Sequence, residues 1–278
     1  MSAGIDAHVH LWNRAVDPQD WIDPKTMAPI ARDFDASDLG EMLAATGLDG
    51  AVLVQSSNSL EESIRLAGLN SSAVVGLVAW VDLAAEVGPQ LDRIRENAVV
   101  PVVGVRHLVH IDQDPEWLMR EEVGVGLAVL EREGLCFDLV VREWQLPQAS
   151  RLAARHGELR FVLDHLGDPP EPGEGRSRWG MRLRDLARQP NVVAKVSGLT
   201  SGHAPGSWGP ADLADLVTIA LGCFGPERLL YGSDWPLAEL GGGAVPWKSA
   251  LETLLDGLSA SESARVFGGN AADVYSLF

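Results

Sequence analysis

Residues 4–12 read GIDAHVHLW, a short apolar run with a polar side chain at every second position. Asp6, His8 and His10 occupy these alternate positions. Because successive side chains of a strand point to opposite faces, the pattern predicts a strand with one apolar face and one face that presents these three residues. Such a strand needs a fold that buries both of its faces and leaves room for polar groups.

Similar runs follow along the whole chain. Amphipathic stretches, whose apolar residues lie three or four positions apart, alternate with these runs. The seven runs are GAVLVQ (50–55), VVGLVAWV (74–81), VPVVGVRHL (100–108), LCFDLVV (135–141), LRFVLDH (159–165), VVAKVS (192–197) and RLLYGSD (228–234). No linker or change of composition divides the 278 residues. The sequence therefore predicts one α/β domain over residues 1–278, a distorted (β/α)8 TIM barrel.

An open, doubly wound sheet shows the same alternation and is the alternative fold. However, no glycine-rich dinucleotide-binding motif follows the first run. The long predicted connections, 13–36, 166–178, 198–209 and 235–246, all follow strands. They would gather at the carboxyl ends of the strands, where barrel enzymes carry their active sites.

The composition of the chain disfavours some classes of binding partner. A net charge of −17 disfavours nucleic acid, and no apolar run is long enough to span a membrane. The first ten residues resemble no export signal, and Cys136 and Cys223 lie in apolar stretches, as expected for buried reduced thiols. We therefore expect a cytoplasmic protein with a small-molecule substrate, with no nucleic-acid or membrane partner, and with homo-oligomers possible.

Four residues form the predicted catalytic centre. His8 and His10 lie toward the carboxyl end of the first strand, and His165 ends the sixth. Closure of a barrel makes the last strand a neighbour of the first, which would bring Asp234 beside the two histidines. Three imidazoles and a carboxylate can hold one zinc-like divalent cation, or can act on a substrate directly.

The sequence determines less well where three further charged side chains point: those of Arg106, Asp164 and Lys195. Arg106 and His107 have opposite parity, as do Asp164 and His165. We expect His107 and His165 to face inward, which leaves Arg106 and Asp164 for ion pairs on the outside of the barrel unless the strands bulge. Lys195, within an apolar strand, either extends its amine to solvent or meets an anionic group in the site.

Tryptophans are unusually frequent, nine against two tyrosines. Four of them lie at strand ends or in the long connections: Trp12, Trp80, Trp208 and Trp235. We expect them to form an aromatic wall for the apolar face of a sugar-like ring.

Several motifs together resemble one family. They are IDAHVHLW, GLVAWVDL, GVRHLVH followed by DPEWL, GLCFDLVVR, LRFVLDHLGDPP, NVVAKVSGL, PERLLYGSDWP and GGNAADVY, in order over almost the whole chain. The pattern resembles the amidohydrolase superfamily (amidohydrolase-related family 2), in particular its lactonase branch with the L-fuconolactonase-like and pyrone-dicarboxylate-lactonase-like enzymes.

The resemblance implies a distorted barrel, hydrolysis of a lactone, and a site made by His8, His10, His165 and Asp234. Dinuclear members carry a metal-bridging lysine where this chain has Arg106 and His107. We therefore expect no two-metal site, and either no obligatory cofactor or one divalent cation.

These features support a hypothesis for the reaction. Asp234 takes a proton from water and returns it to the leaving alkoxide of a sugar-acid lactone such as L-fucono-1,5-lactone. The expected substrate-binding residues are Arg106, His107, Lys195, Trp80, Trp12 and Trp235. A pyrone-dicarboxylate-type lactonase, which would need several inward arginines, a metal-dependent decarboxylase of the same superfamily and a catalytically silent sugar-acid-binding protein are the alternatives.

Overall fold

Eight parallel strands pair in chain order in the computed structural model, which describes residues 3–278. Each strand is shorter than predicted, and all eight predicted strands are confirmed: β1 (Ile5–Val9), β2 (Gly50–Val54), β3 (Val74–Ala79), β4 (Val102–His107), β5 (Cys136–Leu139), β6 (Phe161–Leu163), β7 (Val192–Val196) and β8 (Leu229–Tyr231). Just beyond the ends of β1 and β8, His10 N donates a hydrogen bond to Trp235 O over 2.7 Å, and Asp234 N donates to His8 O over 2.9 Å. These bonds bring the first and last strands together and nearly close the barrel.

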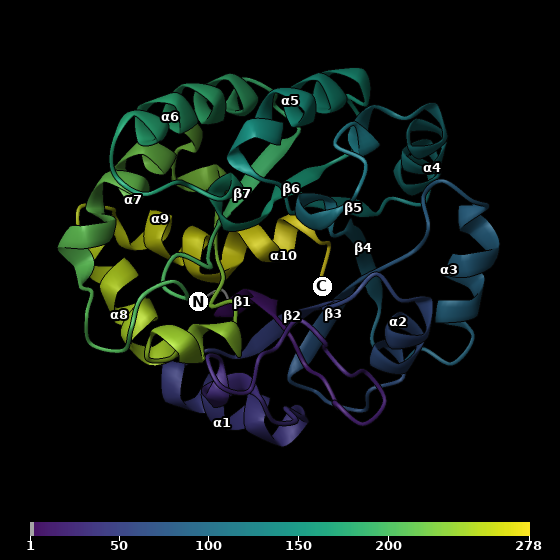
Figure 1. Ribbon diagram of the computed structural model, residues 1–278, viewed down its shortest axis with the longest axis horizontal. Coiled ribbons are helices and arrows are strands. Elements are labelled where there is room, and N and C mark those ends of the chain that lie inside the picture. Colours follow the sequence, from purple (N-terminus) through teal and green to yellow (C-terminus); the bar gives the residue numbers. More distant parts are fainter. Residues whose placement is uncertain (1–2) are drawn as a thin grey trace.

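Most of the helices surround the strands, as Figure 1 shows, and α10 (Asn270–Val274) lies across the centre. The others are α1 (Ala36–Thr46), α2 (Leu60–Ala67), α3 (Val87–Arg95), α4 (Glu121–Arg132), α5 (Leu146–Arg155), α6 (Glu174–Ala187), α7 (Pro210–Phe224), α8 (Ala244–Leu254) and α9 (Ala260–Ala264). Short single-turn helices interrupt the loops. Across residues 3–278, no helix combines the length and the apolar character needed to cross a bilayer.

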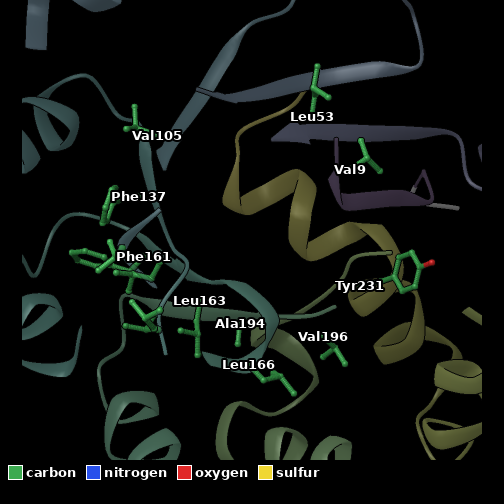
Figure 2. Packing of buried hydrophobic residues seen from close by; sticks show 14 of the residues in the cluster. Val9, Leu53, Val105, Phe137, Phe161, Leu163, Leu166, Ala194, Val196 and Tyr231 are labelled. Atoms are coloured by element: carbon green, nitrogen blue, oxygen red, sulfur yellow. The ribbon is translucent and has the colours of Figure 1, made fainter. Parts of the chain in front are cut away.

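The main core lies between the barrel and these helices. Outward-facing strand residues form it, among them Leu53, Val105 and Val196 (Figure 2). The rings of Phe137 and Phe161, on neighbouring strands, meet edge to face with their centroids 6.2 Å apart. Complete burial of such a side chain contributes about 1.5–3 kcal/mol, so this layer supplies most of the stability of the fold.

A second, smaller core fills the barrel interior and is closed by α10, near the centre of Figure 1. Tyr275, directly after α10, donates its hydroxyl hydrogen to Asp138 Oδ2 over 2.8 Å. The Cys136 thiol contacts the carbonyl oxygen of Val274 at 3.1 Å. Cys136 is buried as predicted, whereas Cys223 is only partly buried. The helix therefore closes the amino end of the barrel and leaves the carboxyl end open.

Long connections gather at that open end. The connection from β1 to α1 is the longest of them, and the ones after β6, β7 and β8 are also extended. Asp35 ends the first connection by accepting hydrogen bonds from the backbone of Ser37 and Asp38, which caps α1. The predicted position of the functional surface at the carboxyl ends of the strands agrees with this arrangement.

Candidate active site and metal centre

A β-bulge in β1 sets the directions of the first site residues. Asp6 pairs with Ala51 and Val9 pairs with Leu53, so three steps along β1 match two along β2. Ala51 and Leu53 both belong to the outer core. Asp6 therefore lies on the outer face of the sheet, and the prediction that it faces the barrel interior is wrong. The extra residue shifts the alternation of side chains by one position after Asp6, so His8 faces the barrel interior as predicted.

Two further directions in β1 change with the bulge. Ile5 and Ala7 pack in the barrel interior rather than against the helices, contrary to the strict alternation. The carboxylate of Asp6 holds the bulge in place, because its Oδ1 accepts hydrogen bonds from the backbone nitrogens of His8 (3.0 Å) and Ser233 (2.9 Å). Burial raises the pKa of Asp6 to about 6, which those two hydrogen bonds partly oppose.

His8, His10 and Asp234 converge on one point. The two Nε2 atoms lie 3.1 Å apart, and Asp234 Oδ1 lies 3.6 Å from that of His8 and 3.4 Å from that of His10. Nitrogen and oxygen ligands about 2.0–2.1 Å from a tetrahedral zinc ion would be separated by about 3.3–3.4 Å. The three atoms thus have nearly the spacing of one face of a coordination tetrahedron.

The hydrogen bonds around these atoms also suit a cation. His10 Nδ1 lies 2.8 Å from the carbonyl oxygen of Val54, which makes Nδ1 the donor and leaves a lone pair on Nε2. Asp234 Oδ1 is buried and has no hydrogen-bond partner within residues 3–278. Burial lowers the pKa of His8 well below its ordinary value, so its imidazole is neutral at pH 7. The residues present therefore fit one divalent cation.

Asp234 is held in position by its backbone. Its φ of 59° lies in the left-handed region, which non-glycine residues adopt at a cost of roughly 1–3 kcal/mol and which clusters at functional sites. Two residues earlier, a Cβ on Gly232 would lie 2.9 Å from the Cβ of His8, so only glycine allows this close approach. Burial opposes ionisation of Asp234, but His165, His10 and His8 together hold its pKa below the ordinary value.

Beneath this centre lies a buried network of charges. Lys195 Nζ lies 2.5 Å from Asp138 Oδ2, 2.9 Å from Asp164 Oδ1 and 3.1 Å from His8 Nδ1. All four residues are completely or almost completely buried. Of the two directions open for Lys195, the structure has the second, in which the amine meets anionic groups. Lys195 supports His8 from below and does not line the cavity.

Arg106 and His107 have the reverse of the predicted directions. Arg106 faces the interior, where its Nη1 donates to Asp164 Oδ2 over 2.9 Å and lies 3.3 Å from His8 Nε2. His107 faces outward, and its ring stacks on Trp117 with centroids 3.9 Å apart. Asp164, expected outside, is also interior and buried. Burial raises its pKa, but Lys195, His8 and Arg106 hold it well below the ordinary value.

His165 faces the cavity as predicted. Its Nδ1 lies 2.9 Å from the hydroxyl of Ser197, and its ring centroid lies 4.6 Å from that of His8. A ligand atom of His165 belongs to a second group with His8 and Asp164, within 4.8 Å, rather than to the group with His10 and Asp234. The four predicted residues are therefore brought together, with His165 beside the other three.

A cavity of about 430 Å³ opens above the centre. It is lined by Arg106 of β4 and by residues that follow seven of the strands: His10, Trp21, Ser56, Leu108, His110, Ile111, Val140, Val141, Arg142, Asp164, His165, Asp168, Gly198, Ser201, Asp234 and Leu237. This volume is within the range of sites for small molecules, about 300–1,000 Å³. The cavity thus suits a single small substrate.

The predicted aromatic wall does not form. Trp12 and Trp235 are buried against Phe34, and Trp80 packs against His107, so none of these three tryptophans lines the cavity. Trp208 borders a separate groove with Gly241. Trp21, in the first long loop, is the tryptophan that lines the cavity, and it was not singled out because nothing in its neighbourhood marks it.

The sequence analysis also missed Asp138, Ser197 and Asp168. Asp138 carried the same signal as Lys195, a charged residue inside an apolar strand, and the two form one ion pair. Ser197 and Asp168 belong to the quoted motifs NVVAKVSGL and LRFVLDHLGDPP but have no individual signal. His110 ends the quoted motif GVRHLVH and has no individual signal either, yet it lines the cavity.

A parallel eight-stranded barrel with histidines and aspartates gathered at the carboxyl ends of its strands is the arrangement of a barrel enzyme whose site can activate water or a bound carbonyl group. Residues 5–277 match the amidohydrolase family. The chain belongs to this family and is an enzyme of the hydrolase class, which confirms the resemblance.

Two relatives carry a specific activity in their names. An L-fucono-1,5-lactonase of Burkholderia ambifaria is 34% identical over 100% of this chain and 97% of its own length. The L-fucono-1,5-lactonase of Burkholderia multivorans is 32% identical over 98% of this chain and 96% of its own length.

Solved structures share the fold, and one of them contains zinc. The crystal structure of an amidohydrolase from Burkholderia multivorans with bound zinc is 31% identical and superposes with a TM-score of 0.91 over 100% of both chains. A putative 2-pyrone-4,6-dicarboxylic acid hydrolase from Pseudomonas putida, 22% identical over 100% of this chain and 98% of its own, gives a TM-score of 0.75 and shares the fold.

Proposed function

We propose that this protein hydrolyses a neutral sugar-acid lactone, such as L-fucono-1,5-lactone. The observation that carries the proposal is the charge balance of the cavity. Each arginine that lines it is already paired with an aspartate: Arg106 with Asp164 at 2.9 Å, and Arg142 with Asp168 at 3.0 Å. Asp234 adds a further negative charge.

This balance supports a neutral substrate over a dicarboxylate. A pyrone dicarboxylate carries two negative charges, and each would have to displace an aspartate from its arginine or remain unpaired in the cavity. A hydroxylated lactone carries no charge and needs only hydrogen bonds. The names of the two Burkholderia relatives support the same class of substrate.

Asp234 acts as the general base in the proposed reaction. Its carboxylate takes a proton from water while the water oxygen bonds to the lactone carbonyl carbon. The bond from that carbon to the ring oxygen then breaks, and Asp234 returns the proton to the alkoxide, which gives an open hydroxy acid. The lowered pKa of Asp234 keeps its carboxylate ionised at neutral pH.

His8, His10 and Asp234 are the residues that would hold a divalent cation. Such an ion supplies Lewis-acid polarisation of the carbonyl oxygen. Arg106 lies 3.3 Å from His8 Nε2 and lines the cavity, so its guanidinium stabilises negative charge that develops on the substrate. Lys195 positions His8 and does not contact the substrate. His107, Trp12, Trp80 and Trp235 support the loops from outside the cavity.

A pH-indicator assay tests the proposal. Purified protein is mixed with L- and D-aldono-1,4- and 1,5-lactones and with 2-pyrone-4,6-dicarboxylate, each with and without a chelator. We expect proton release from at least one sugar lactone and none from the pyrone. Asp234→Asn is the inactive control, and His156→Ala, at the end of α5 and outside the cavity, is the matched histidine control.

Each outcome is informative. Loss of activity on chelation and recovery with zinc would assign carbonyl polarisation to a bound ion, and activity that survives chelation would assign it to the protein groups. Turnover of the pyrone alone would contradict the charge argument. If no lactone is hydrolysed but CO2 is released from a carboxylated substrate, the protein is a decarboxylase and the proposal is wrong.

A further inference from the structure

Four consecutive residues after β6 adopt a left-handed backbone conformation. The φ angles are 53° for His165 and Leu166, 71° for Gly167 and 57° for Asp168. Residues other than glycine adopt this region at an energetic cost, and runs of them are rare. The turn is held by Trp179, whose Nε1 donates to the carbonyl oxygen of Leu166 over 2.8 Å. It places both His165 and Asp168 on the wall of the cavity.

Asp168 meets Arg142 on that wall. Arg142 Nη1 donates to Asp168 Oδ2 over 3.0 Å. The backbone nitrogen of Arg142 donates to Gln145 Oε1 over 2.8 Å, which fixes the backbone of Arg142. Both charged side chains are about half exposed, so their remaining hydrogen-bonding positions are open to a ligand. The pair is electrically neutral as a whole.

His110 lies on the same wall and is not used by the proposed reaction. Its backbone nitrogen donates to the carbonyl oxygen of Val140 over 3.2 Å, which ties the loop after β4 to the end of β5. Its Nδ1 is buried and finds no hydrogen-bond partner anywhere in residues 3–278. Buried polar groups in native proteins rarely lack a partner, so the protein alone does not satisfy the His110 ring, which lines the cavity.

The charge state of His110 defines what it can bind. Burial and, to a smaller extent, the nearby Arg106 and Arg142 lower its pKa to about 4. A neutral imidazole has one N–H donor and one acceptor nitrogen. A hydroxyl group has the same two functions, so an imidazole and a hydroxyl satisfy each other in either direction.

We propose that His110, Arg142 and Asp168 form a hydroxyl-binding subsite for the ring hydroxyls of a polyhydroxylated lactone, with His110 as a specificity-determining residue. Asp168 accepts from hydroxyls, Arg142 donates to them, and His110 does either. An anionic ligand on this wall would meet the negative charge of Asp168 beside Arg142, whereas a neutral hydroxylated ring meets no opposing charge. The inference rests on the proposed function, in which the centre at His8, His10 and Asp234 holds the lactone carbonyl.

The kinetic test compares two lactones of the same ring size. One is a hydroxylated 1,5-lactone turned over by the wild type, and the other is δ-valerolactone, which has no hydroxyls. We expect His110→Ala to lower kcat/KM roughly 10- to 100-fold for the hydroxylated lactone, chiefly through KM, and less than about threefold for δ-valerolactone. His110→Asn, which keeps a donor and an acceptor, recovers part of the loss. We expect His156→Ala to leave kcat/KM unchanged for both substrates.

A binding test separates the subsite from the chemistry. The probe is the hydroxylated 1,5-lactam of the same sugar acid, which resists hydrolysis, and the readout is its Kd by calorimetry. We expect the wild type to bind it, and both His110→Ala and Asp168→Asn to weaken binding at least tenfold. Lactam binding without hydrolysis of any lactone would overturn the proposed function and leave the subsite standing.

Two results would overturn the subsite itself. One is an equal loss by His110→Ala on both lactones, which would make His110 a general structural or catalytic residue. The other is lactam binding by His110→Ala as tight as that of the wild type. A wild type that neither hydrolyses lactones nor binds the lactam would contradict the subsite and the proposed function together.

Discussion

Replacing Lys195 by methionine tests the buried network under the active site. The amine lies 2.5 Å from Asp138 Oδ2 and 2.9 Å from Asp164 Oδ1, and all three side chains are wholly excluded from solvent. With Arg106, the network holds two positive and two negative charges. Lys195→Met leaves one negative charge uncompensated. Removal of one partner from a buried ion pair typically costs about 3–5 kcal/mol.

The cost of Lys195→Met depends on pH in a direction that the structure fixes. Burial already raises the pKa of Asp138 to about 6, although Lys195 opposes the shift. Without the amine, that pKa rises further above its value in the unfolded chain. When a carboxyl group has a higher pKa in the folded state than in the unfolded chain, the free energy of unfolding falls as the pH rises from the unfolded-state pKa to the folded-state pKa. The variant is therefore least destabilised near pH 4–5 and most destabilised near pH 8.

Thermal and urea unfolding at pH 5 and pH 8 measure this effect. At pH 8 we expect a free energy of unfolding about 3–5 kcal/mol lower than that of the wild type, or a Tm roughly 5–9 °C lower. The double variant Lys195→Met with Asp138→Asn removes the stranded charge and recovers much of the loss without the pH dependence. A Lys195→Met protein within about 1 kcal/mol of the wild type at pH 8, or no recovery in the double variant, would refute the reasoning.

Three further outcomes follow from the site. Asp234→Asn lowers kcat about 10²- to 10⁴-fold with little change in Tm, measured by the lactone assay and calorimetry; a kcat near that of the wild type excludes the general-base role. His10→Ala removes one of three converging ligand atoms, so zinc bound after dialysis, measured by atomic emission, falls to background, and undiminished zinc would contradict the assignment. Gly198→Ala introduces a Cβ 2.5 Å from His165 Nδ1 at a φ of +67°, so we expect about 1–3 kcal/mol lower stability in urea unfolding and reduced kcat; a neutral variant would show that His165 moves aside freely.

Eight alternating strands and helices were predictable because periodicity depends on burial, and every strand of a barrel is covered on both sides. The convergence of His8, His10 and Asp234 was also predictable, since barrel closure makes the first and last strands neighbours. These residues lie at strand ends that the topology alone brings together. The expected inward direction of His165 agrees with the structure as well.

Side-chain directions within a strand were predicted less well. Simple alternation placed Asp6 inside and Ile5 outside, and both are wrong because β1 carries an extra residue opposite β2. Arg106 and His107 had equal claims to the interior by parity, and only the register with β5, where Arg106 pairs with Asp138, distinguishes them. A bulge is a property of two paired strands, so a single run of residues does not reveal it.

The tryptophans illustrate a different limit. A large aromatic ring at a strand end packs against whichever loop covers it, and the long loop after β1 turns Trp12 toward Phe34 rather than toward the cavity. Trp21 reaches the cavity because its indole nitrogen donates to Gln19, which in turn donates to Ser56. Contacts of this kind join residues far apart in the chain, and composition does not encode them.

The bulge in β1 also limits how this centre can be moved to another scaffold. A designer who copied only the His-x-His spacing onto a regular strand of a different barrel would present both imidazoles. The one-residue register shift that positions them relative to the neighbouring strands would be lost. The segment has to be transplanted together with its additional residue and with the carboxylate of Asp6, which fastens the backbone of His8 to that of Ser233. Deletion of a single residue between Asp6 and Val9 would remove the bulge, so the hydrogen bonds that Asp6 accepts from the backbone of His8 and Ser233 would be displaced or lost.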